Sequence, residues 1–278
     1  LEDTKIETLH QTFVDAFSDY QVKIDLPFWK FKEMLQRRGY VSEISIGAFQ
    51  NERLIGFVLN GLRSWNGKKT VYDLGTGVIG DFRKKGLTSN MLLKIRDVFY
   101  DKKVEQYLLE VIQTNTSAFE LYKKQGFEIV RDFACFMSEN NNIKKDKTWN
   151  VEHIDRFNHD DWKLLREFWD FAPSWQNSVD SVSALYNAFT YSIVRDDNRI
   201  VGYGLMDRRT GDIPQLAVDK GYRNKGVAGS IIADLCENTE SSVVSVLNVQ
   251  DDIKSMKDFL LSAGFKSAVS QYEMILKF

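Results

Sequence analysis

Two stretches decide the fold: VIGDFRKKGLT at residues 78–88 and VDKGYRNKGVA at residues 218–228. Each follows a run typical of a strand and precedes an apolar-periodic run typical of a helix. A helix start offers unpaired N–H groups and the positive end of the helix dipole, and glycine lets the backbone approach an anion closely. A lone stretch of this kind would more often be an ordinary helix start. Because the pattern occurs twice at the same spacing, it predicts loops that wrap a pyrophosphate.

The two stretches belong to an internal repeat. Residues 47–57 (GAFQNERLIGF) correspond to residues 193–203 (IVRDDNRIVGY), and residues 109–127 (LEVIQTNTSAFELYKKQGF) align without a gap to residues 247–265 (LNVQDDIKSMKDFLLSAGF). Three matching blocks in one order indicate a duplication. The polar stretch SENNNIKKDKT separates them and has no apolar period. It predicts a first domain at 1–138, a linker at 139–148 and a second domain at 149–278.

Hydrophobic periodicity predicts the same alternation of helices and strands in both copies. In the first copy we expect helices at 5–17, 28–37, 86–100 and 116–125, with strands at 44–49, 54–62, 70–79, 106–112 and on to 137. In the second we expect helices at 160–170, 179–188, 227–239 and 252–263, with strands at 149–154, 190–195, 199–207, 212–218, 243–249 and on to 278. The first copy has no counterpart of the 149–154 strand, so we expect one to precede Leu1 in the full protein.

Composition and charge restrict the class of protein. The 278 residues are 43% hydrophobic and 27% charged, with a net charge of −2, which is typical of a globular protein and argues against nucleic-acid or membrane partners. No apolar run reaches the roughly 18 residues of a membrane span, and no signal peptide is recognisable. Two cysteines in different halves indicate a reducing, cytoplasmic location. Three scattered histidines and the lack of a ligand motif predict no metal site.

With these motifs the sequence resembles the GNAT superfamily of acyl-CoA-dependent N-acyltransferases, twice and over nearly the whole chain. The family loop is Gln/Arg-x-x-Gly-x-Gly/Ala, which Arg223, Gly226 and Ala228 match fully, whereas the first copy departs at Thr88. The resemblance implies an α/β (α+β) fold of two tandem domains, each a mixed, mostly antiparallel, splayed sheet flanked by helices. It also implies acetyl-CoA as cosubstrate, bound by strand ends and loops.

The residues that the resemblance assigns to acetyl-CoA binding come from both copies. They are Val78, Ile79, Arg83, Lys84, Lys85, Gly86, Leu87, Thr88 and Asn115 in the first, and Val218, Arg223, Asn224, Lys225, Gly226, Val227 and Ala228 in the second.

Residues 109–127 supply candidate acid–base groups. Aminolysis of a thioester needs a base for the amine and benefits from an acid at the thiolate. The block is similar to that of ribosomal-protein alanine N-acetyltransferases, which implies Glu110 as base, directly or through water, and Tyr122 as acid; Asp73 is a reserve base. The structural alternatives are helix packing for Tyr122, a solvated strand edge for Glu110 and a helix N-cap for Asn115.

The second copy replaces these three residues by Asn248, Ile253 and Leu260, none of which can transfer a proton. We therefore predict that the first domain transfers an acetyl group from acetyl-CoA to a primary amine by direct attack. The acceptor is a small-molecule or peptide amine. Two alternatives remain: catalysis in the second domain, or a non-catalytic CoA-binding sensor or scaffold.

Overall fold

The computed structural model describes residues 1–19 and 25–278 and divides them into two compact units. The first unit is Leu1–Val130 together with Glu273–Phe278, and the second is Arg131–Tyr272. The units therefore exchange the ends of the sequence repeats. Most of β5 (Glu128–Glu139), which closes the first repeat, lies in the second unit, whereas β11 (Lys266–Lys277) ends in the first. The domain limits predicted from the sequence describe the two copies of the repeat and not the two compact units, and they stay a prediction.

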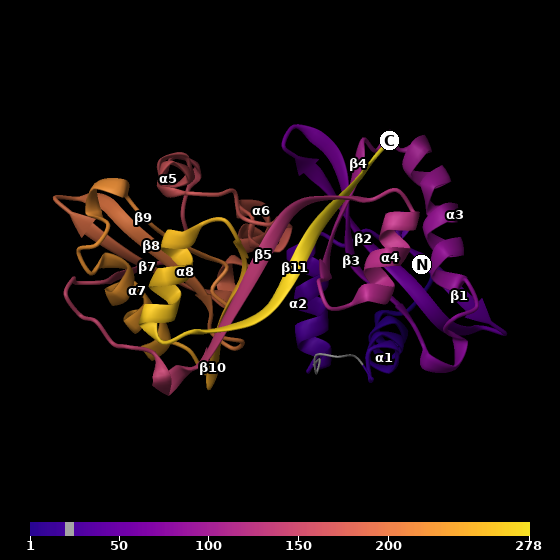
Figure 1. Cartoon of the computed structure of the whole chain (residues 1–278), viewed down its shortest axis with the longest axis horizontal. Coiled ribbons are helices and arrows are strands. Elements are labelled where there is room, and N and C mark those ends of the chain that lie inside the picture. The colour runs from indigo at the N-terminus through magenta and orange to yellow at the C-terminus, as the bar shows by residue number, and fades with distance from the viewer. Residues whose placement is uncertain (20–24) are drawn as a thin grey trace. The chain divides into compact units, whose positions relative to one another are not determined.

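The sheet of the first unit parts at one side. Its strands are β1 (Ile46–Gln50), β2 (Arg53–Trp65), β3 (Lys68–Val78) and β4 (Gln106–Ile112), in this order, with the end of β11 beside β4 (Figure 1). The first three strands are antiparallel, and β3 and β4 are parallel. Among the described residues, the ladder between β3 and β4 covers only Thr70–Tyr72 of β3. The rest of β3 therefore diverges from β4, as the splayed sheet of the sequence analysis requires.

Helices cover both faces of this sheet. They are α1 (Ile6–Ala16), α2 (Phe28–Arg38), α3 (Leu87–Asp101) and α4 (Thr116–Lys124). Phe13 of α1 stacks on Phe57 of β2, with ring centroids 5.4 Å apart. A Cβ on the neighbouring Gly56 would instead lie 3.4 Å from Met91 of α3. Since successive residues of a strand point to opposite faces, α1 and α3 lie on opposite sides of β2.

In the second unit the parting of the sheet goes further. One antiparallel sheet contains β6 (Glu152–Ile154), β7 (Phe189–Asp196), β8 (Arg199–Asp207) and β9 (Gln215–Val218). The next strand, β10 (Val243–Gln250), pairs with β5 instead. A single isolated bridge, Asp212 to Ser245, joins the two sides within the described residues.

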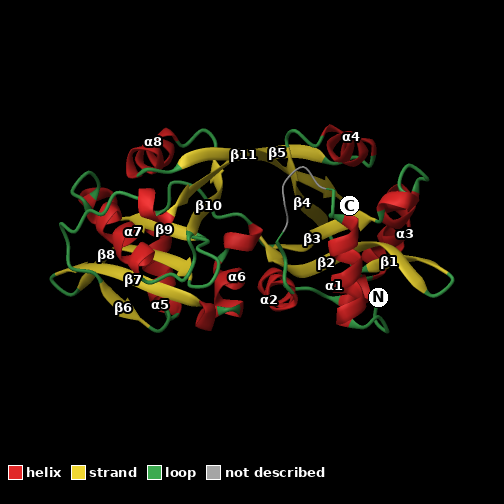
Figure 2. Cartoon of the chain, turned by 90° about the horizontal axis from the view of Figure 1, so that it is seen from below, coloured by secondary structure: helices red, strands yellow, loops and turns green. Residues whose placement is uncertain are grey.

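The helices of the second unit repeat the plan of the first. They are α5 (His159–Leu165), α6 (Val179–Ala184), α7 (Val227–Glu237) and α8 (Lys254–Ala263) (Figure 2). Gly202 and Gly204 of β8 lie directly against Val227 and Ile231 of α7. The helix can pack this close to the strand only because these two positions carry no side chain. The intervening Tyr203 points to the other face and packs on Phe157 and Trp162.

The expected fold is confirmed: mixed α/β units with mostly antiparallel strands, flanked by helices. The helix expected at 160–170 is shorter, because α5 ends at Leu165 and a 3-10 turn follows at Arg166–Phe168. Trp169 is already extended, and its indole N–H donates to the Tyr203 hydroxyl at 2.6 Å, which fixes this early end. None of the described helices is both long and apolar enough to cross a membrane.

Candidate active site

The first loop, residues 83–88, joins the splayed end of β3 to the start of α3. Lys84 (φ 60°) and Gly86 (φ 75°) both adopt left-handed backbone conformations, which turn the chain sharply into the helix. Alternating conformations of this kind form anion-binding concavities, and the first N–H groups of α3 have no partner inside the helix. A Cβ on Gly86 would meet no atom within 4 Å. The space in front of this glycine is therefore open.

A cavity of about 570 Å³ connects the first loop to the candidate acid. Its wall includes Thr76 and Val78 of β3, Thr88 of the loop, and Asn115 and Tyr122 beside and on α4. The structure thus brings the predicted cofactor loop and Tyr122 to one cavity, although they lie far apart in the sequence. Glu110 is not among the described residues that line it.

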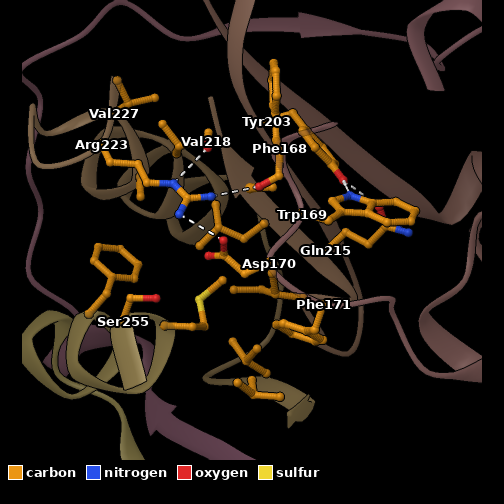
Figure 3. A pocket seen from close by; sticks show the side chains of 18 of the residues that line it. Phe168, Trp169, Asp170, Phe171, Tyr203, Gln215, Val218, Arg223, Val227 and Ser255 are labelled. Atoms are coloured by element: carbon orange, nitrogen blue, oxygen red, sulfur yellow. Dashed lines mark hydrogen bonds and ion pairs between the residues drawn. The ribbon is translucent and has the colours of Figure 1, made fainter. Parts of the chain in front are cut away.

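The second loop, residues 223–228, has the same backbone shape, with Asn224 at φ 59° and Gly226 at φ 84°. It borders a cavity of about 470 Å³ in the second unit. The Arg223 guanidinium bonds to three groups on two segments (Figure 3). It donates to the carbonyl of Val218 at 3.3 Å, to the carboxylate of Asp170 at 3.0 Å and to the carbonyl of Phe168 at 2.9 Å.

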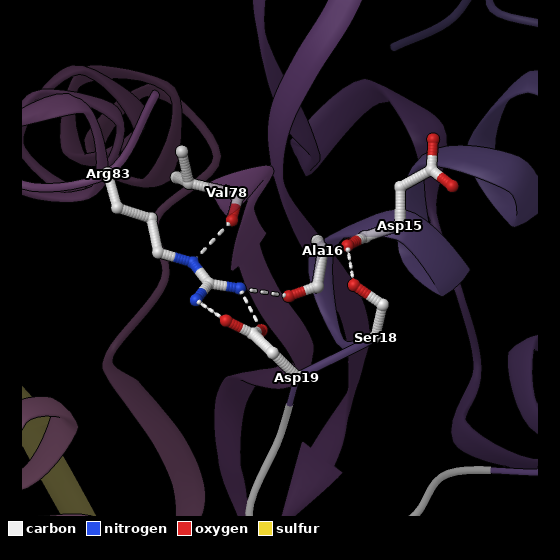
Figure 4. A network of polar contacts seen from close by, with 6 residues as sticks. All are labelled: Asp15, Ala16, Ser18, Asp19, Val78 and Arg83. Carbon is white, nitrogen blue, oxygen red and sulfur yellow. Dashed lines mark hydrogen bonds and ion pairs between the residues drawn. The ribbon is translucent and has the colours of Figure 1, made fainter. Parts of the chain in front are cut away.

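Arg83 makes the equivalent contacts in the first unit (Figure 4). It donates to the Val78 carbonyl at 3.0 Å, to both carboxylate oxygens of Asp19 at 2.7 Å and to the Ala16 carbonyl at 2.7 Å. The hydrogen bond from Arg83 holds the pKa of the Asp19 carboxyl below its usual range. In both units the arginine thus ties its loop to the strand end and to the segment after an early helix, and we call this contact the arginine brace.

The Tyr122 hydroxyl lies over a buried carboxylate. It donates to Asp73 Oδ2 at 3.3 Å, and the Thr76 hydroxyl donates to the same oxygen at 2.7 Å. Both Asp73 and Tyr122 are only 8% exposed. Burial raises the pKa of Asp73 to about 6, against the opposing effect of its hydrogen bonds to Thr76, Gly75 and Tyr122. Asp73 can therefore gain or lose a proton near neutral pH.

Glu110 lies on β4, two residues beyond the last rung of the ladder with β3. Its Oε2 accepts a hydrogen bond from the Tyr72 hydroxyl across the diverging strands. Burial, followed by the nearby Glu110 carboxylate, holds the pKa of Tyr72 well above its usual range, so Tyr72 remains a donor. The carboxylate of Glu110 is thus oriented by Tyr72 at the point where the strands part.

Asn115 caps α4. Its Oδ1 accepts from the Ala118 N–H at 3.2 Å and from the Ser117 hydroxyl at 3.1 Å. This is the N-cap contact that the sequence left open as an alternative. Asn115 also borders the first cavity, so the residue that caps α4 forms part of the cavity wall.

In the second unit the corresponding residues have structural roles. Asn248 is 1% exposed; its amide donates to Ser174 Oγ at 3.1 Å and accepts from Gln271 at 3.0 Å. Leu260 is fully buried, and Ile253 occupies the N-cap position of α8 without a side-chain cap. These positions therefore hold no group for proton transfer.

The carboxylates of the arginine brace were not predicted from the sequence. Asp19 and Asp170 stand at matching places in FSD (17–19) and FWD (168–170), so a repeated Phe-x-Asp pattern was present. It is too short to be noticed without knowledge of its partner arginines. No group of three or more His, Cys, Asp or Glu side chains among the described residues is arranged to hold a metal ion.

Comparison with known proteins agrees with the geometry. The model of the Acetyltransferase (GNAT) family matches residues 6–127, and that of an Acetyltransferase (GNAT) domain matches residues 172–274. The chain therefore belongs to the GNAT acetyltransferases and contains two such domains in tandem.

Solved structures share this fold at low sequence identity. A GCN5-related N-acetyltransferase from Sphaerobacter thermophilus is 14% identical, with a TM-score of 0.71 and coverage of 97% of this chain and 91% of that one. A tandem GNAT protein from the clavulanic acid biosynthesis pathway is 9% identical, with a TM-score of 0.71 and coverage of 98% and 94%. A fungal GH3 β-N-acetylglucosaminidase containing a glucosamine N-acetyltransferase region is 14% identical, with a TM-score of 0.70 and coverage of 99% and 37%.

Proposed function

We propose that the first unit transfers the acetyl group of acetyl-CoA to a primary amine, with the first loop binding the CoA phosphates and Tyr122 acting on the leaving sulfur. The observation that carries this proposal is the cavity of about 570 Å³ whose wall includes both the first loop and Tyr122. In the second unit the position of Tyr122 is taken by buried Leu260, so acid catalysis of this kind is confined to the first.

The proposed reaction proceeds by direct attack. The amine nitrogen forms a bond to the thioester carbon while its surplus proton passes, through water, to Glu110. Collapse of the tetrahedral intermediate breaks the carbon–sulfur bond, and Tyr122 gives its proton to the sulfur, which leaves as the CoA thiol. The Tyr122 oxygen regains a proton from water, or from Asp73 when Asp73 is protonated. The products are the N-acetyl amine and free CoA.

The splayed end of β3 supports the proposed binding of the pantetheine arm. Beyond Tyr72, the side of β3 that faces β4 has no ladder within the described residues. The carbonyls of Leu74 and Val78 already accept from Arg38 and Arg83. The other backbone groups on this side can bond to an amide-containing arm and to a developing oxyanion. The open space at Gly86 and the positive end of α3 then favour the phosphates at the other end of the same ligand.

The acceptor is proposed by class: a small-molecule or peptide primary amine. The glucosamine N-acetyltransferase region of the fungal enzyme makes an amino sugar a reasonable first substrate to try. Neither a nucleic acid nor a membrane is part of the proposal, and we propose a cytoplasmic protein.

The test is release of the CoA thiol from acetyl-CoA in the presence of glucosamine, a peptide with a free N-terminus, simple alkylamines and an aminoglycoside. Amine-dependent release should occur with at least one of them and should be lost in Gly86→Trp, whose side chain would fill the open space. Gly67→Trp is the matched control, because Gly67 also has a positive φ (77°) and no atom within 4 Å, yet lies outside the cavity. No release with any amine, or equal loss in both variants, would contradict the proposal.

A further inference from the structure

The segment at residues 144–149, here called the strap, runs along α7 of the second unit. Lys147 pairs with Glu237 in the last turn of the helix, at 2.9 Å. At the other end the Trp149 indole donates to the Lys225 carbonyl at 2.7 Å, and the Trp149 N–H donates to the Ser230 hydroxyl at 3.1 Å. The strap is thus fixed at both ends of the helix and passes over its first turn.

Two side chains of the strap cover the glycines of this first turn. A Cβ on Gly226 would lie 2.9 Å from Thr148 Oγ1 and 3.2 Å from Asp146 Oδ2. A Cβ on Gly229 would lie 2.9 Å from Asp146 Oδ2. The shape of the strap is held locally, since Asp146 Oδ1 accepts the Thr148 N–H at 3.0 Å. The Asp146 carboxylate therefore stands at the start of α7, against the glycine of the second loop.

The first loop lacks such a cover. Gly86 is the counterpart of Gly226, with the same left-handed backbone, yet a Cβ on it would meet nothing within 4 Å. The two copies thus differ in whether the space in front of the loop glycine is filled. This contrast is independent of the Thr88 and Ala228 difference in the loop pattern.

The charge of Asp146 adds to the steric cover. A carboxylate at a helix start interacts favourably with the positive end of the helix dipole, as a phosphate would. A pyrophosphate approaching the second loop would meet this negative charge as well as the two side chains. The second loop still borders the cavity of the second unit, so the strap fills the space in front of Gly226 and Gly229 and not the whole cavity.

We propose that the strap occupies the phosphate-binding position of the second unit, so that the chain binds a single CoA molecule, in the first unit. This inference rests on the proposed function, because it takes the first loop to be a CoA site. It identifies residues 144–149 as the bound partner of the second loop. It also argues against catalysis in the second unit, since the CoA phosphates would have to displace Thr148 and Asp146 from the space in front of Gly226.

Isothermal titration calorimetry with CoA counts the sites in four proteins. The wild type should bind one CoA, and Lys84→Glu, which places a negative charge in the first loop, should weaken that site at least tenfold. Asp146→Gly with Thr148→Gly removes both covering side chains and should bind two. Adding Lys84→Glu to this double variant should leave one site, now in the second unit.

Other outcomes distinguish the strap proposal from the proposed function of the first unit. Two CoA sites in the wild type would overturn the strap proposal but would leave the proposed function of the first unit standing. A single site that survives Lys84→Glu would also overturn the strap proposal. No CoA binding to the wild type would overturn the proposed function together with this inference. A double variant that still binds only one CoA would show that the strap does not close the second loop.

Hydrogen exchange gives a second readout. The Trp149 amide should stay protected in free and CoA-saturated wild type, and a loss of protection on addition of CoA would contradict the proposal.

Discussion

Tyr122 stands between two environments, the first cavity and the buried Asp73. Its ring packs edge-on to Phe127 with centroids 5.6 Å apart, so its position does not depend on the hydroxyl. The hydroxyl connects the cavity to the Asp73 carboxylate, as the hydroxyl of Thr76 also does. A substitution that removes only this oxygen therefore tests the proposed chemistry separately from packing.

Tyr122→Phe should lower kcat about a hundredfold and leave the KM for acetyl-CoA nearly unchanged. Positioned acids contribute roughly 10² to 10⁴ in rate, and a thiolate, as a fair leaving group, calls for the low end. Steady-state kinetics with the best amine measures both constants. Leu260→Ala at the matching position of the second unit is the control: it should cost about 2–5 kcal/mol of stability without a comparable loss of kcat. A full kcat in Tyr122→Phe would remove Tyr122 from the mechanism.

Asp73→Asn should change how stability depends on pH. Burial raises the pKa of Asp73 from 3.8 to about 6, so between these values the folded protein keeps a proton that the unfolded chain has lost. The free energy of unfolding should therefore fall as pH rises through this window, by about 3 kcal/mol from this group, and Asn should abolish that part.

Urea denaturation of the wild type and Asp73→Asn at pH 3.5 and pH 7.5 measures the difference. Asp3→Asn, at an exposed carboxylate near the start of the chain, is the control for the same substitution on the surface. Parallel curves for wild type and Asp73→Asn would contradict the raised pKa.

At the scale of elements, the arginine brace joins each loop to a segment far away in the chain. Arg83 and Asp19 are 64 residues apart, and Arg223 and Asp170 are 53 apart. In both units the fork of the guanidinium spans a carboxylate and two backbone carbonyls, a geometry that a lysine ammonium cannot reproduce. The brace thus fixes the loop before any ligand arrives.

Arg83→Lys should raise the KM for acetyl-CoA roughly tenfold, because the charge is kept but the fork that holds the loop is lost. If the charge itself served the phosphates, lysine would retain the affinity. Arg208→Lys is the control, since Arg208 donates to the carbonyls of Phe189 and Asn187 away from either loop. An unchanged KM in Arg83→Lys would exclude the bracing role.

The sequence was sufficient for most helices and strands and for the two loops, but not for the residues that their side chains contact. Periodicity predicts α3 and β4 closely because a buried face repeats along the chain itself. The brace carboxylate Asp19, the contact of Asp73 with Tyr122 and the cover of Gly226 by Thr148 depend on distant segments meeting in the fold. A single sequence does not show which distant residues meet, even where a short repeated pattern such as Phe-x-Asp marks one of the partners. The early end of α5 was missed for the same reason, since the bond from Trp169 to Tyr203 is also a contact between distant segments.

At the scale of the whole molecule, the exchange of strand ends ties the last residues of the chain to the first unit. The Phe278 N–H donates to the Glu105 carbonyl at 3.0 Å, and its ring lies 5.9 Å from that of Phe99. Deleting Glu273–Phe278 should therefore expose β4 (Gln106–Ile112), although the deletion falls at the end of the second repeat.

Hydrogen exchange followed by mass spectrometry tests this deletion. Amides of β4 should lose protection, and those of β7 and β8 should keep it. Deleting Phe278 alone should give a smaller effect in the same place. Loss of protection confined to the second unit would contradict the assignment of the last six residues to the first.

This exchange also bears on how the protein is made. Domains generally fold as units during synthesis, the N-terminal one first. Here the sheet of the first unit includes Glu273–Phe278, so it cannot be completed until these residues have left the ribosome, after the second unit has been translated. The residues of the proposed acetyl-transfer site are thus translated long before the end of β11 that lies beside β4, and a chain released before residue 273 would lack this part of the first unit.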